Sequence, residues 1–548
     1  MENDRELRNK KLLKCSYITI IIFTCLIGAL FYRQVIKGKY YKQEAIKQRT
    51  TSIRVYPPRG TILDRNSIPL TNRDREEVLF VSKNILNNSE IKNNIKEICN
   101  LNDKELDDII NHSDRVIELP IVKDIKKEIE GVIKSEKTLR YSKEKLLSHV
   151  IGYVKESENI GVSGVEKIYD NILKMDDKYG TINFQFDGKN RPLKGVATPV
   201  LKEEIGYTNS IMLTIDYHIQ KIVEKALDKY KSNGAVIVTD TQSGDILAMA
   251  SRPNIDPENI NIKSDKLDNY NKAIHVGYPP ASLFKTVVLL SALENNEIIL
   301  DESFYCKGYE EIGNVKINCH SIKDGGHEKL KINEAFYDSC NSVFIQLGKR
   351  LGGKNIIKTA KKLGFGSNVD IELAGEIKGS LPQGDELLGP SVGNISIGQG
   401  KILVTPLQIT NMMMIIANDG IEKDISIFKG FVTNNGSIVK KGRREEPKKV
   451  VSKLYTDIIK DYMKEVVTKG TAKGYVSLEG IGGAAGKTGT AQAMFNGKEV
   501  KHGWFSGFYP KDNPKYVITV LVEEGNSGGR SAGPIFNDIA EEIYTIGK

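Results

Sequence analysis

The sequence lacks a concentrated charge of either sign. Its 79 basic and 70 acidic residues leave a net charge of +9 over 548 residues, and no basic stretch is interleaved with aromatic side chains. Because a nucleic-acid-binding surface usually shows such a stretch, the composition argues against a nucleic-acid partner. No internal repeat is apparent, so the chain is not an array of copied modules. Hydrophobic residues make up 40% of the chain, which is enough for large cores, and the length predicts about three domains.

Charge is missing entirely from one segment near the start of the chain. The 18 residues from Cys15 to Tyr32 carry no charged side chain, and Leu12 and Leu13 extend the apolar run. About 20 apolar residues are needed to cross a bilayer. The alternative is a cleaved signal peptide, which has a shorter apolar core and an A-x-A-like cleavage site. No such site follows, because Arg33 comes next, so the sequence predicts an uncleaved transmembrane anchor at residues 12–32.

Basic residues beside this segment predict its orientation. By the positive-inside rule, the more basic flank lies in the cytoplasm. We therefore expect a short cytoplasmic tail at residues 1–11 and an extracytoplasmic location for everything after Arg33. Three basic residues on the outer flank weaken this signal. The flanking basic residues are Arg5, Arg8, Lys10, Lys11 and Lys14 before the segment, and Arg33, Lys37 and Lys39 after it.

Three short motifs carry the chemistry that the sequence suggests. They are Ser282-Leu283-Phe284-Lys285, Ser339-Cys340-Asn341 and Lys487-Thr488-Gly489-Thr490. Each is common by chance, but their order and separation are informative, since 57 residues separate the two serines and 148 separate Ser339 from Lys487. An S-x-x-K, S-x-N and K-T-G set in this order is typical of enzymes in which a serine attacks an acyl group and forms a covalent acyl-enzyme.

Ser282 and Lys285 fit the roles of nucleophile and base. Positions i and i+3 share one face of a helix, so the lysine amine is expected near the serine hydroxyl. A serine hydroxyl needs a base within about 3 Å, and burial can lower a lysine pKa until the neutral amine accepts a proton. The turn at 277–281 and the apolar run from Leu283 to Leu293 predict a buried helix with the serine at its N-terminal end.

The third motif is predicted to lie on a strand. The small residues at 482–486 allow another backbone to approach closely. Lys487 then supplies a fixed cation, and Thr488 a hydroxyl, for a substrate carboxylate. The backbone N–H groups of Thr490 and Ser282 are expected to form an oxyanion hole.

Other segments predict the architecture around these motifs. Residues 234–240 and 245–251 are predicted strands joined by a hairpin turn. Residues 516–522 form another predicted strand, which is expected to pair with the strand that holds Lys487. A helix from Pro534 to about residue 546 is expected to close the chain and to leave no room for an appended domain. An antiparallel sheet with helices packed on it follows, which is an α/β arrangement.

In these residues and motifs the chain resembles a class B penicillin-binding protein, a cell-wall D,D-transpeptidase with a single membrane anchor. The likeness covers nearly all of the second half of the chain and only islands of the first. It departs from the family at Ala281, where glycine usually precedes the nucleophile, and at Gly503, where alanine is common. Further stretches that agree with the family pattern are residues 59–66, 161–166, 214–216 with Gln220, 234–256, 396–400, 405–408 and 502–505.

The resemblance implies a fold, a domain order and an activity. The fold is an α/β (α+β) transpeptidase domain of the penicillin-binding and serine β-lactamase type, with a central antiparallel sheet flanked by helices, at residues 206–548. A pedestal or dimerisation-like domain at residues 33–205 would lift it off the membrane. The activity is the cross-linking of peptidoglycan stem peptides through a serine acyl-enzyme, and β-lactams would acylate the same serine.

The resemblance also assigns roles to the motif residues. Ser282 would attack the penultimate D-alanine carbonyl of a stem peptide, and Lys285 would take its proton. Ser339, aided by Lys487, would pass a proton to the leaving amine. Asn341 would hold the substrate amide.

Substrate binding and partners follow from the same comparison. Lys487, Thr488, Gly489 and Thr490 are expected at the terminal carboxylate of the substrate. The expected partners are peptidoglycan stem peptides, β-lactam antibiotics and the cell membrane. A separate membrane glycosyltransferase is also expected, because the chain has no space for a polymerase domain of its own. Catalysis is expected to need no cofactor.

Cysteine and histidine are scarce, yet five of them gather in one stretch. The chain has six cysteines and seven histidines, and Cys306, Cys319, His320, His327 and Cys340 lie close together in sequence. A Cys306–Cys319 disulfide, simple buried thiols and a structural Zn²⁺ with four N/S ligands all remain open. Some class B relatives carry zinc beside the S-x-N motif. This resemblance favours Cys306, Cys319, His327 and Cys340 as ligands, with His320 as the spare.

Two other function classes remain open. A D,D-carboxypeptidase or β-lactamase would use water as the acceptor, but no clear additional glutamate base lies between the S-x-N and K-T-G motifs. A non-enzymatic β-lactam sensor would need an intracellular signalling domain, and the short cytoplasmic tail at residues 1–11 cannot form one.

Overall fold

The computed structural model divides the chain into two compact units that alternate along the sequence. The first unit comprises residues 1–57, 75–139 and 176–204, and the second comprises residues 58–74, 140–175 and 205–548. The predicted domain boundary at residues 205 and 206 lies outside the described residues. The structure describes residues 2–55, 59–113, 115–123, 129, 131–155, 158–174, 181–187, 198–200, 209–260, 267–433, 436–495 and 498–547.

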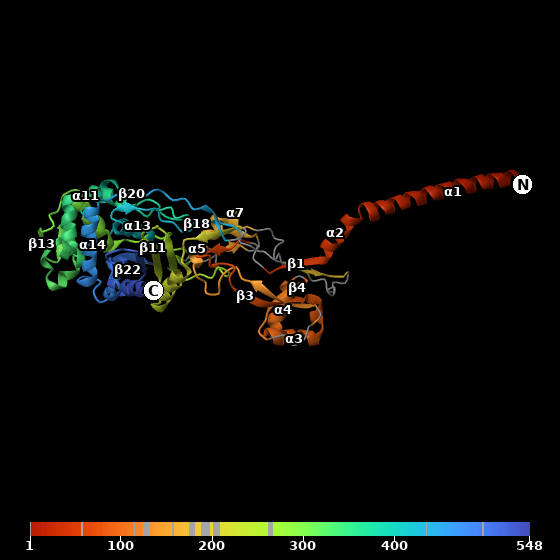
Figure 1. Ribbon diagram of the computed structural model, residues 1–548, viewed down its shortest axis with the longest axis horizontal. Coiled ribbons are helices and arrows are strands. Elements are labelled where there is room, and N and C mark those ends of the chain that lie inside the picture. Colours follow the sequence, from red (N-terminus) through yellow and green to blue (C-terminus); the bar gives the residue numbers. More distant parts are fainter. Residues whose placement is uncertain are drawn as a thin grey trace. The chain divides into compact units, whose positions relative to one another are not determined.

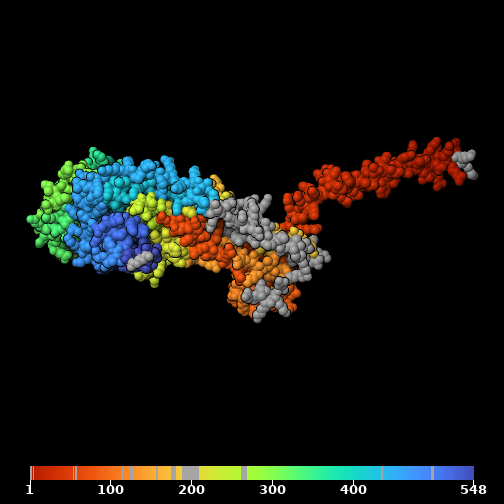
Figure 2. Space-filling view, viewed as in Figure 1, coloured from red at the N-terminus to blue at the C-terminus, as the bar shows by residue number. Residues whose placement is uncertain are grey.

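The first unit begins with a long apolar helix, α1 (Glu2–Phe31). The helical stretch Arg5–Ile36 is long and apolar enough to cross a membrane, and none of its most apolar part is covered by other residues. Figure 2 shows it as a rod of uncovered side chains. After it come η1 (Tyr32–Ile36), α2 (Gly38–Arg49), β1 (Thr50–Arg54), β8 (Thr181–Gln185) and β9 (Thr198–Val200).

The same unit contains a small three-stranded sheet covered by two helices (Figure 1). Leu79, Ile95, Leu106 and Ile117 are fully buried between the sheet and the helices, so each element has one apolar face. The elements are β3 (Arg75–Ser82), η2 (Lys83–Asn87), α3 (Ser89–Cys99), α4 (Asp103–His112), β4 (Val116–Pro120) and β5 (Val132–Thr138).

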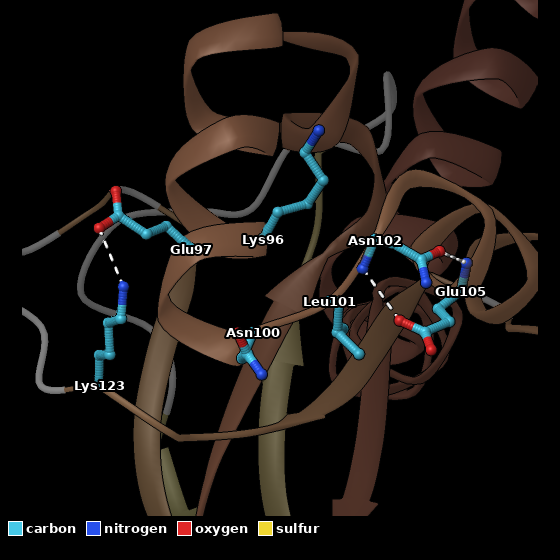
Figure 3. A pocket seen from close by; sticks show the side chains of 7 residues that line it. All are labelled: Lys96, Glu97, Asn100, Leu101, Asn102, Glu105 and Lys123. Carbon is cyan, nitrogen blue, oxygen red and sulfur yellow. Dashed lines mark hydrogen bonds and ion pairs between the residues drawn. The ribbon is translucent and has the colours of Figure 1, made fainter.

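A polar hollow lies where α3 turns into α4 (Figure 3). Asn102 and Glu105 form a reciprocal capping box at the start of α4. Lys123 forms an ion pair with Glu97 at 3.2 Å. The polar groups of this hollow are therefore used in holding the helix ends, and we assign it no ligand.

The second unit is built on a five-stranded antiparallel sheet. Its strand order is β12 (Ile246–Arg252), β11 (Gly234–Asp240), β23 (Tyr516–Val522), β22 (Lys498–Tyr509) and β21 (Ala485–Phe495). The predicted hairpin of β11 and β12 is confirmed. The predicted pairing of strand 516–522 with the Lys487 strand is wrong, because β22 lies between β23 and β21 and pairs with both.

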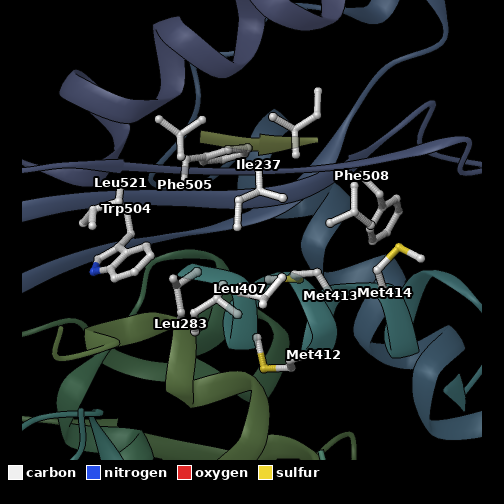
Figure 4. Packing of buried hydrophobic residues seen from close by; sticks show 14 of the residues in the cluster. Ile237, Leu283, Leu407, Met412, Met413, Met414, Trp504, Phe505, Phe508 and Leu521 are labelled. Carbon is white, nitrogen blue, oxygen red and sulfur yellow. The ribbon is translucent and has the colours of Figure 1, made fainter. Parts of the chain in front are cut away.

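Helices cover both faces of this sheet. Figure 4 shows Trp504 with Leu283 and Leu407 on one face and Phe505 on the other. Phe505 packs edge-on against Phe536 of α15 (Gly533–Ile546), with ring centroids 4.6 Å apart. The fully buried helix α13 (Pro406–Ala417) lies on the face with Trp504. The predicted fold class, a central antiparallel sheet flanked by helices, is therefore confirmed.

A helical layer beside the sheet holds the S-x-x-K motif. The short 3-10 helix η4 (Ala281–Phe284) leads into α9 (Lys285–Glu294), which is almost entirely buried. The other elements of this unit are β2 (Ile62–Leu63), α5 (Ser148–Ile151), β6 (Val154–Lys155), β7 (Ile160–Gly161), α6 (Gly164–Ile168), α7 (Asp170–Leu173), β10 (Ser210–Leu213), α8 (Tyr217–Lys229), β13 (Ser303–Cys306), β14 (Tyr309–Ile312), β15 (Val315–Asn318), β16 (Glu328–Lys331), α10 (Ile332–Tyr337), α11 (Asn341–Lys362), α12 (Ser391–Ser396), β17 (Ile421–Glu422), β18 (Phe428–Val432), β19 (Ile438–Lys441), β20 (Lys448–Lys449) and α14 (Lys453–Thr468).

A buried ionic network joins separate segments of the second unit. Glu166 is fully buried and accepts hydrogen bonds from Nε of Arg59 and from Nε of Arg140, each at 2.7 Å. Arg59 also bonds Asp170 at 2.7 Å. Two guanidinium groups and two carboxylates therefore neutralise one another, and of these four Asp170 is partly exposed. Removing one member would leave the others charged and unpaired, which is the most costly way to disturb a buried ion pair.

We predict that Glu166→Ala lowers the free energy of unfolding by about 3–5 kcal/mol. The matched control is Glu136→Ala, which removes the exposed partner of Arg75 and should cost less than about 1 kcal/mol. Urea unfolding followed by circular dichroism measures both. Equal, small effects of the two substitutions would contradict a structural role for the network.

Candidate active site

The turn that carries Ser282 is held by hydrogen bonds from distant segments. Ala281 has a φ of +49°, a left-handed conformation that costs a residue with a side chain about 1–2 kcal/mol. Its N–H donates to the carbonyl of Gly398 at 2.9 Å. The indole N–H of Trp504 donates to the carbonyl of Pro279 at 3.1 Å. These bonds fix the backbone immediately before Ser282, so the surrounding fold sets the position of this serine.

Ser282 is half-buried in η4, and in the part of the chain that the structure describes its hydroxyl has no hydrogen-bond partner. A polar atom that is neither deeply buried nor bonded is available to a substrate. Lys285 follows three residues later and is completely buried. The predicted helix is present, but the serine lies in the 3-10 turn before α9 and not in α9 itself.

Two lysine amines meet at the hydroxyl of Ser339. Nζ of Lys285 donates to the carbonyl of Ser339 at 2.6 Å and contacts its Oγ at 3.2 Å. It also donates to Oδ1 of Asn341 at 2.8 Å. Nζ of Lys487 lies 3.1 Å from the same Oγ. The structure thus brings together residues from all three motifs.

Burial changes the proton affinity of both amines. It lowers the pKa of Lys285 to about 8. The pKa of Lys487 lies well below its usual value. Burial is the larger cause, and the nearby charge of Lys285 is the second. Because both amines lie beside one hydroxyl, protonating both at once is unfavourable. The site can therefore exchange a proton near neutral pH.

Ser339 lies in a strained turn between α10 and α11. Its φ is +58°, a region that non-glycine residues rarely adopt. The next residue, Cys340, occupies the N-cap position of α11 without a side-chain capping bond, and Asn341 begins that helix. Nδ2 of Asn341 donates to the carbonyl of Asn318 in β15 at 3.1 Å. The amide of Asn341 is thus held by β15 through its Nδ2 and by Lys285 through its Oδ1.

The K-T-G motif lies on β21, at the edge of the sheet. Oγ1 of Thr488 lies 2.6 Å from Oγ1 of Thr471, and Oγ1 of Thr490 accepts the N–H of Gly528 at 3.2 Å. A Cβ on Gly528 would lie 2.4 Å from the carbonyl oxygen of Gly489. Glycine is therefore needed where this loop crosses β21.

Sequence reasoning assigned no role to several residues that hold this site. Trp504 and Gly398 fall in stretches that agree with the family pattern, and the structure gives them direct contacts to the turn at residues 277–281. Tyr278 donates its hydroxyl to Glu523 at 2.7 Å and so fixes the start of that turn. In the sequence, only the joint presence of these short family-like stretches could have pointed to such residues.

The Cys/His cluster is gathered beside the S-x-N turn. One ligand atom each from Cys306, Cys319, His327 and Cys340 lie within 4.8 Å of one another. His320 is exposed and lies outside this group of four, although its ring is 4.9 Å from that of His327. All six cysteines of the chain are free thiols in the structure.

Two of the distances within this group match those in a tetrahedral zinc site. Two sulfurs at about 2.3 Å from one tetrahedral Zn²⁺ lie about 3.8 Å apart, and a sulfur and a nitrogen about 3.6 Å apart. The distance from Sγ of Cys319 to Sγ of Cys340 is 3.9 Å, and to Nδ1 of His327 it is 3.6 Å. Hydrogen bonding to Cys319 raises the pKa of His327 to about 9.

Family models match most of the chain. Residues 234–541 match the penicillin binding protein transpeptidase domain, and residues 54–202 match the penicillin-binding protein dimerisation domain. The first of these covers more than half of the chain.

Curated relatives align over nearly the whole chain. Stage V sporulation protein D of Bacillus subtilis (strain 168) is 30% identical over 561 residues, which cover 97% of this chain and 85% of that protein. Peptidoglycan D,D-transpeptidase MrdA of Escherichia coli (strain K12) is 25% identical over 606 residues, which cover 96% of this chain and 93% of that protein.

Solved structures share the fold. A penicillin-binding protein (PBP2) from Helicobacter pylori matches with a TM-score of 0.67 at 24% identity and covers 91% of this chain and 99% of its own. The complex of PBP2 with MreC from Helicobacter pylori matches with a TM-score of 0.65, the same identity and the same coverage.

The fold and these matches define an enzyme that transfers acyl groups through a serine. The chain belongs to the class B penicillin-binding proteins, and its activity is that of a peptidoglycan D,D-transpeptidase. Acylation by β-lactams is typical of this family. The family, the fold class and the activity predicted from the sequence are confirmed.

Proposed function

We propose that Ser282 is the nucleophile of this transpeptidase and that Lys285 is its base. The observation that supports this most strongly is the meeting of two buried amines at the Ser339 hydroxyl. One of these amines belongs to Lys285, which follows Ser282 by three residues. An amine with a pKa near 8 is partly neutral at physiological pH, and only the neutral amine can take the serine proton.

The proton then has a route to the leaving group. Ser282 Oγ bonds to the acyl carbon of the penultimate D-alanine, the peptide C–N bond breaks, and the departing amine needs one proton. Ser339 lies within hydrogen-bond distance of both Lys285 and Lys487. It can therefore pass the proton from one of these lysines to the leaving amine. An amine of a second stem peptide then attacks the ester, forms the cross-link and restores the Ser282 hydroxyl.

The edge strand β21 is the proposed binding surface for the donor peptide. An extended peptide can add to an exposed sheet edge through its main chain. We infer that its terminal carboxylate lies at Lys487, Thr488 and Thr490, with Gly489 between them allowing close approach, and that Asn341 holds the substrate amide. The N–H groups of Thr490 and Ser282 would stabilise the oxyanion.

The apolar helix supports a single-pass membrane protein. We infer that residues 12–32 span the cell membrane, residues 1–11 lie in the cytoplasm and the catalytic residues lie outside, where peptidoglycan is found. Residues 33–205 would act as the pedestal for a transpeptidase domain at 206–548. Proposed partners are a separate membrane glycosyltransferase and, by analogy with the solved PBP2 complex, a protein of the MreC type.

We further propose a structural Zn²⁺ bound by Cys306, Cys319, His327 and Cys340. The donor set of three thiols and one imidazole is typical of closed structural zinc sites. Gly326 supports this arrangement, because a Cβ there would lie 2.2 Å from the Cys306 carbonyl oxygen. The metal would take no part in bond making and would fix the turn that holds the catalytic serine of the S-x-N motif.

Ser282→Ala should abolish covalent labelling by a fluorescent penicillin while the protein stays folded. The matched control is Ser291→Ala, which removes a buried hydroxyl without a partner from the same helical segment. It should be labelled at the wild-type rate. Labelling of Ser282→Ala at that rate would refute the assignment of the nucleophile.

The rate of acylation by benzylpenicillin should rise with pH and level off near pH 8. Below its pKa of about 8, Lys285 is mostly protonated, so the reactive neutral fraction falls about tenfold for each pH unit. Lys285→Ala should lower the rate by about 10²–10⁴, and Lys285→Arg, which keeps the charge but cannot lose it, should be similarly slow. A fully active Lys285→Arg would mean that the lysine only binds.

The purified protein should contain about one Zn²⁺ per chain. Chelation should lower the melting temperature, because the metal binds only the folded state well. It should also slow acylation, because Cys340 lies between Ser339 and Asn341 and a shift of about 1 Å in a catalytic group is costly. Elemental analysis and a thiol count measure this. Metal-free protein with a Cys306–Cys319 disulfide would exclude the zinc site.

A further inference from the structure

The segment that follows the membrane anchor is basic in a way that the proposed orientation does not explain. By the positive-inside rule, cations are expected on the cytoplasmic flank of a membrane span. Residues 33–49 nevertheless contain six basic side chains and one acidic side chain, which gives a net charge of +5 on the flank assigned to the outside. Most of this segment forms the helix α2, between α1 and β1 (Figure 1). These cations therefore need another role.

The helix α2 begins at the level of the lipid headgroups. Gly38, its first residue, comes six residues after Tyr32, where the uncharged segment ends, and six helical residues rise about 9 Å. The headgroup layer of one leaflet extends about 5–7 Å beyond the hydrocarbon core. The helical path breaks at Lys37, whose φ is −98° and ψ is 6°. The axis of α2 is therefore free to lie along the membrane surface.

Tyrosines mark the same level. Tyr32, Tyr40 and Tyr41 are all exposed, and the rings of Tyr40 and Tyr41 pack edge-on with centroids 5.5 Å apart. Nζ of Lys37 lies 5.6 Å from the ring centroid of Tyr32. Tyrosine is enriched where a protein passes from lipid to water, because its ring is apolar and its hydroxyl is polar. The exposed rings thus fit a membrane interface.

Three cations of α2 share one face of the helix with an exposed isoleucine. The spacing i, i+3, i+7 and i+10 places on one side of a helix the residues Lys39, Lys42, Ile46 and Arg49. We call these four residues the basic stripe. All four side chains are exposed, and none of the three cations forms an ion pair with a residue that the structure describes. The ion pair printed within α2 instead joins Lys47 to Glu44 at 3.0 Å.

The C-terminal end of α2 is bonded to the rest of the first unit. The N–H of Phe186 donates to the carbonyl of Arg49 at 2.9 Å, and Nη1 of Arg115 donates to the carbonyl of Gln48 at 3.3 Å. The chain then enters β1, which pairs with β8 from Thr50 onward. A surface that holds the basic stripe would therefore also orient this unit.

We propose that the basic stripe of α2 binds anionic lipid headgroups of the outer leaflet and thereby sets the orientation of the first unit on the membrane. The proposal rests on the proposed membrane orientation. Lysine and arginine near an anionic leaflet are attracted to it, and salt screens this attraction. Ile46 and the tyrosines supply apolar surface for the interface. A lipid surface is the occupant that the chain itself brings into place, because the stripe begins seven residues after the end of the anchor.

A tryptophan at position 46 tests this contact. The chain has a single tryptophan, Trp504, which is fully buried and whose signal is subtracted with the unsubstituted protein. Full-length Ile46→Trp protein is placed in nanodiscs of phosphatidylcholine with brominated chains, or of an equal mixture with phosphatidylglycerol that has the same chains. We expect bromine quenching to be at least about twofold stronger with phosphatidylglycerol. The excess should disappear at about 1 M salt, where charges are screened within about 3 Å.

Two triple variants in this background show whether the cations are responsible. Replacing Lys39, Lys42 and Arg49 with glutamine should remove the excess quenching. The matched control replaces with glutamine three exposed lysines that share one face of α11, Lys354, Lys358 and Lys361. It removes the same number of charges and should retain the excess.

The outcomes also separate the lipid from other occupants. Equal quenching in the two lipids would overturn the proposal, whether strong, which means apolar contact alone, or absent, which leaves the stripe to a protein partner. Full excess in the variant without stripe cations would overturn it too. Hydrogen exchange of amides 39–49 in the unsubstituted protein is a second measurement, and exchange that is not slowed by phosphatidylglycerol would contradict the contact. Penicillin labelling of the same sample tests the catalytic proposal separately, and protease access to the catalytic domain in spheroplasts tests the orientation.

Discussion

The constraint on which the site depends is the burial of two lysine amines around one hydroxyl. A buried ammonium group is unfavourable unless its hydrogen bonds are satisfied. Lys285 meets that need with the Ser339 carbonyl, the Ser339 hydroxyl and Asn341. This arrangement requires the left-handed turn at Ser339, and it requires β21 to bring Lys487 to the same point. The helix α9, the turn at Ser339 and the strand β21 therefore meet at one group of polar atoms inside an apolar core.

The family could be predicted from the sequence because the three motifs have fixed residue types and occur in a fixed order. Ser282 and Lys285 are neighbours on a helical turn, and the outer motifs are short strings with fixed residue types. The strand order was mispredicted for a physical reason. β22 contains Gly503 and Gly507 and several charged residues, so it lacks the apolar run that marks β23. Glycine is needed at position 507 because a Cβ there would lie 2.2 Å from the Ala485 carbonyl oxygen.

Support from distant segments could not be predicted, because hydrogen bonds to backbone carbonyls leave no periodic pattern. The bond from Trp504 to the Pro279 carbonyl joins residues far apart in sequence. The environment of the cysteines could not be predicted either, because their spacing is compatible with a disulfide, with buried thiols and with a zinc site. Only the folded chain brings Cys306 and Cys340 next to His327. Both the Trp504 bond and the Cys/His cluster are therefore visible only in the tertiary structure.

The alternation of the two units along the chain affects how the enzyme can be dissected. Residues 58–74 and 140–175 belong to the same compact unit as the transpeptidase residues, and Ile62 in β2 pairs directly with Ile211 in β10. A recombinant fragment that started at residue 206 would lose this strand and expose Ile211 and Leu213, which are fully buried in the intact chain. A soluble form for crystallisation or inhibitor screening should therefore retain the chain from residue 58 onward, with the intervening segment 75–139 left in place or replaced by a linker.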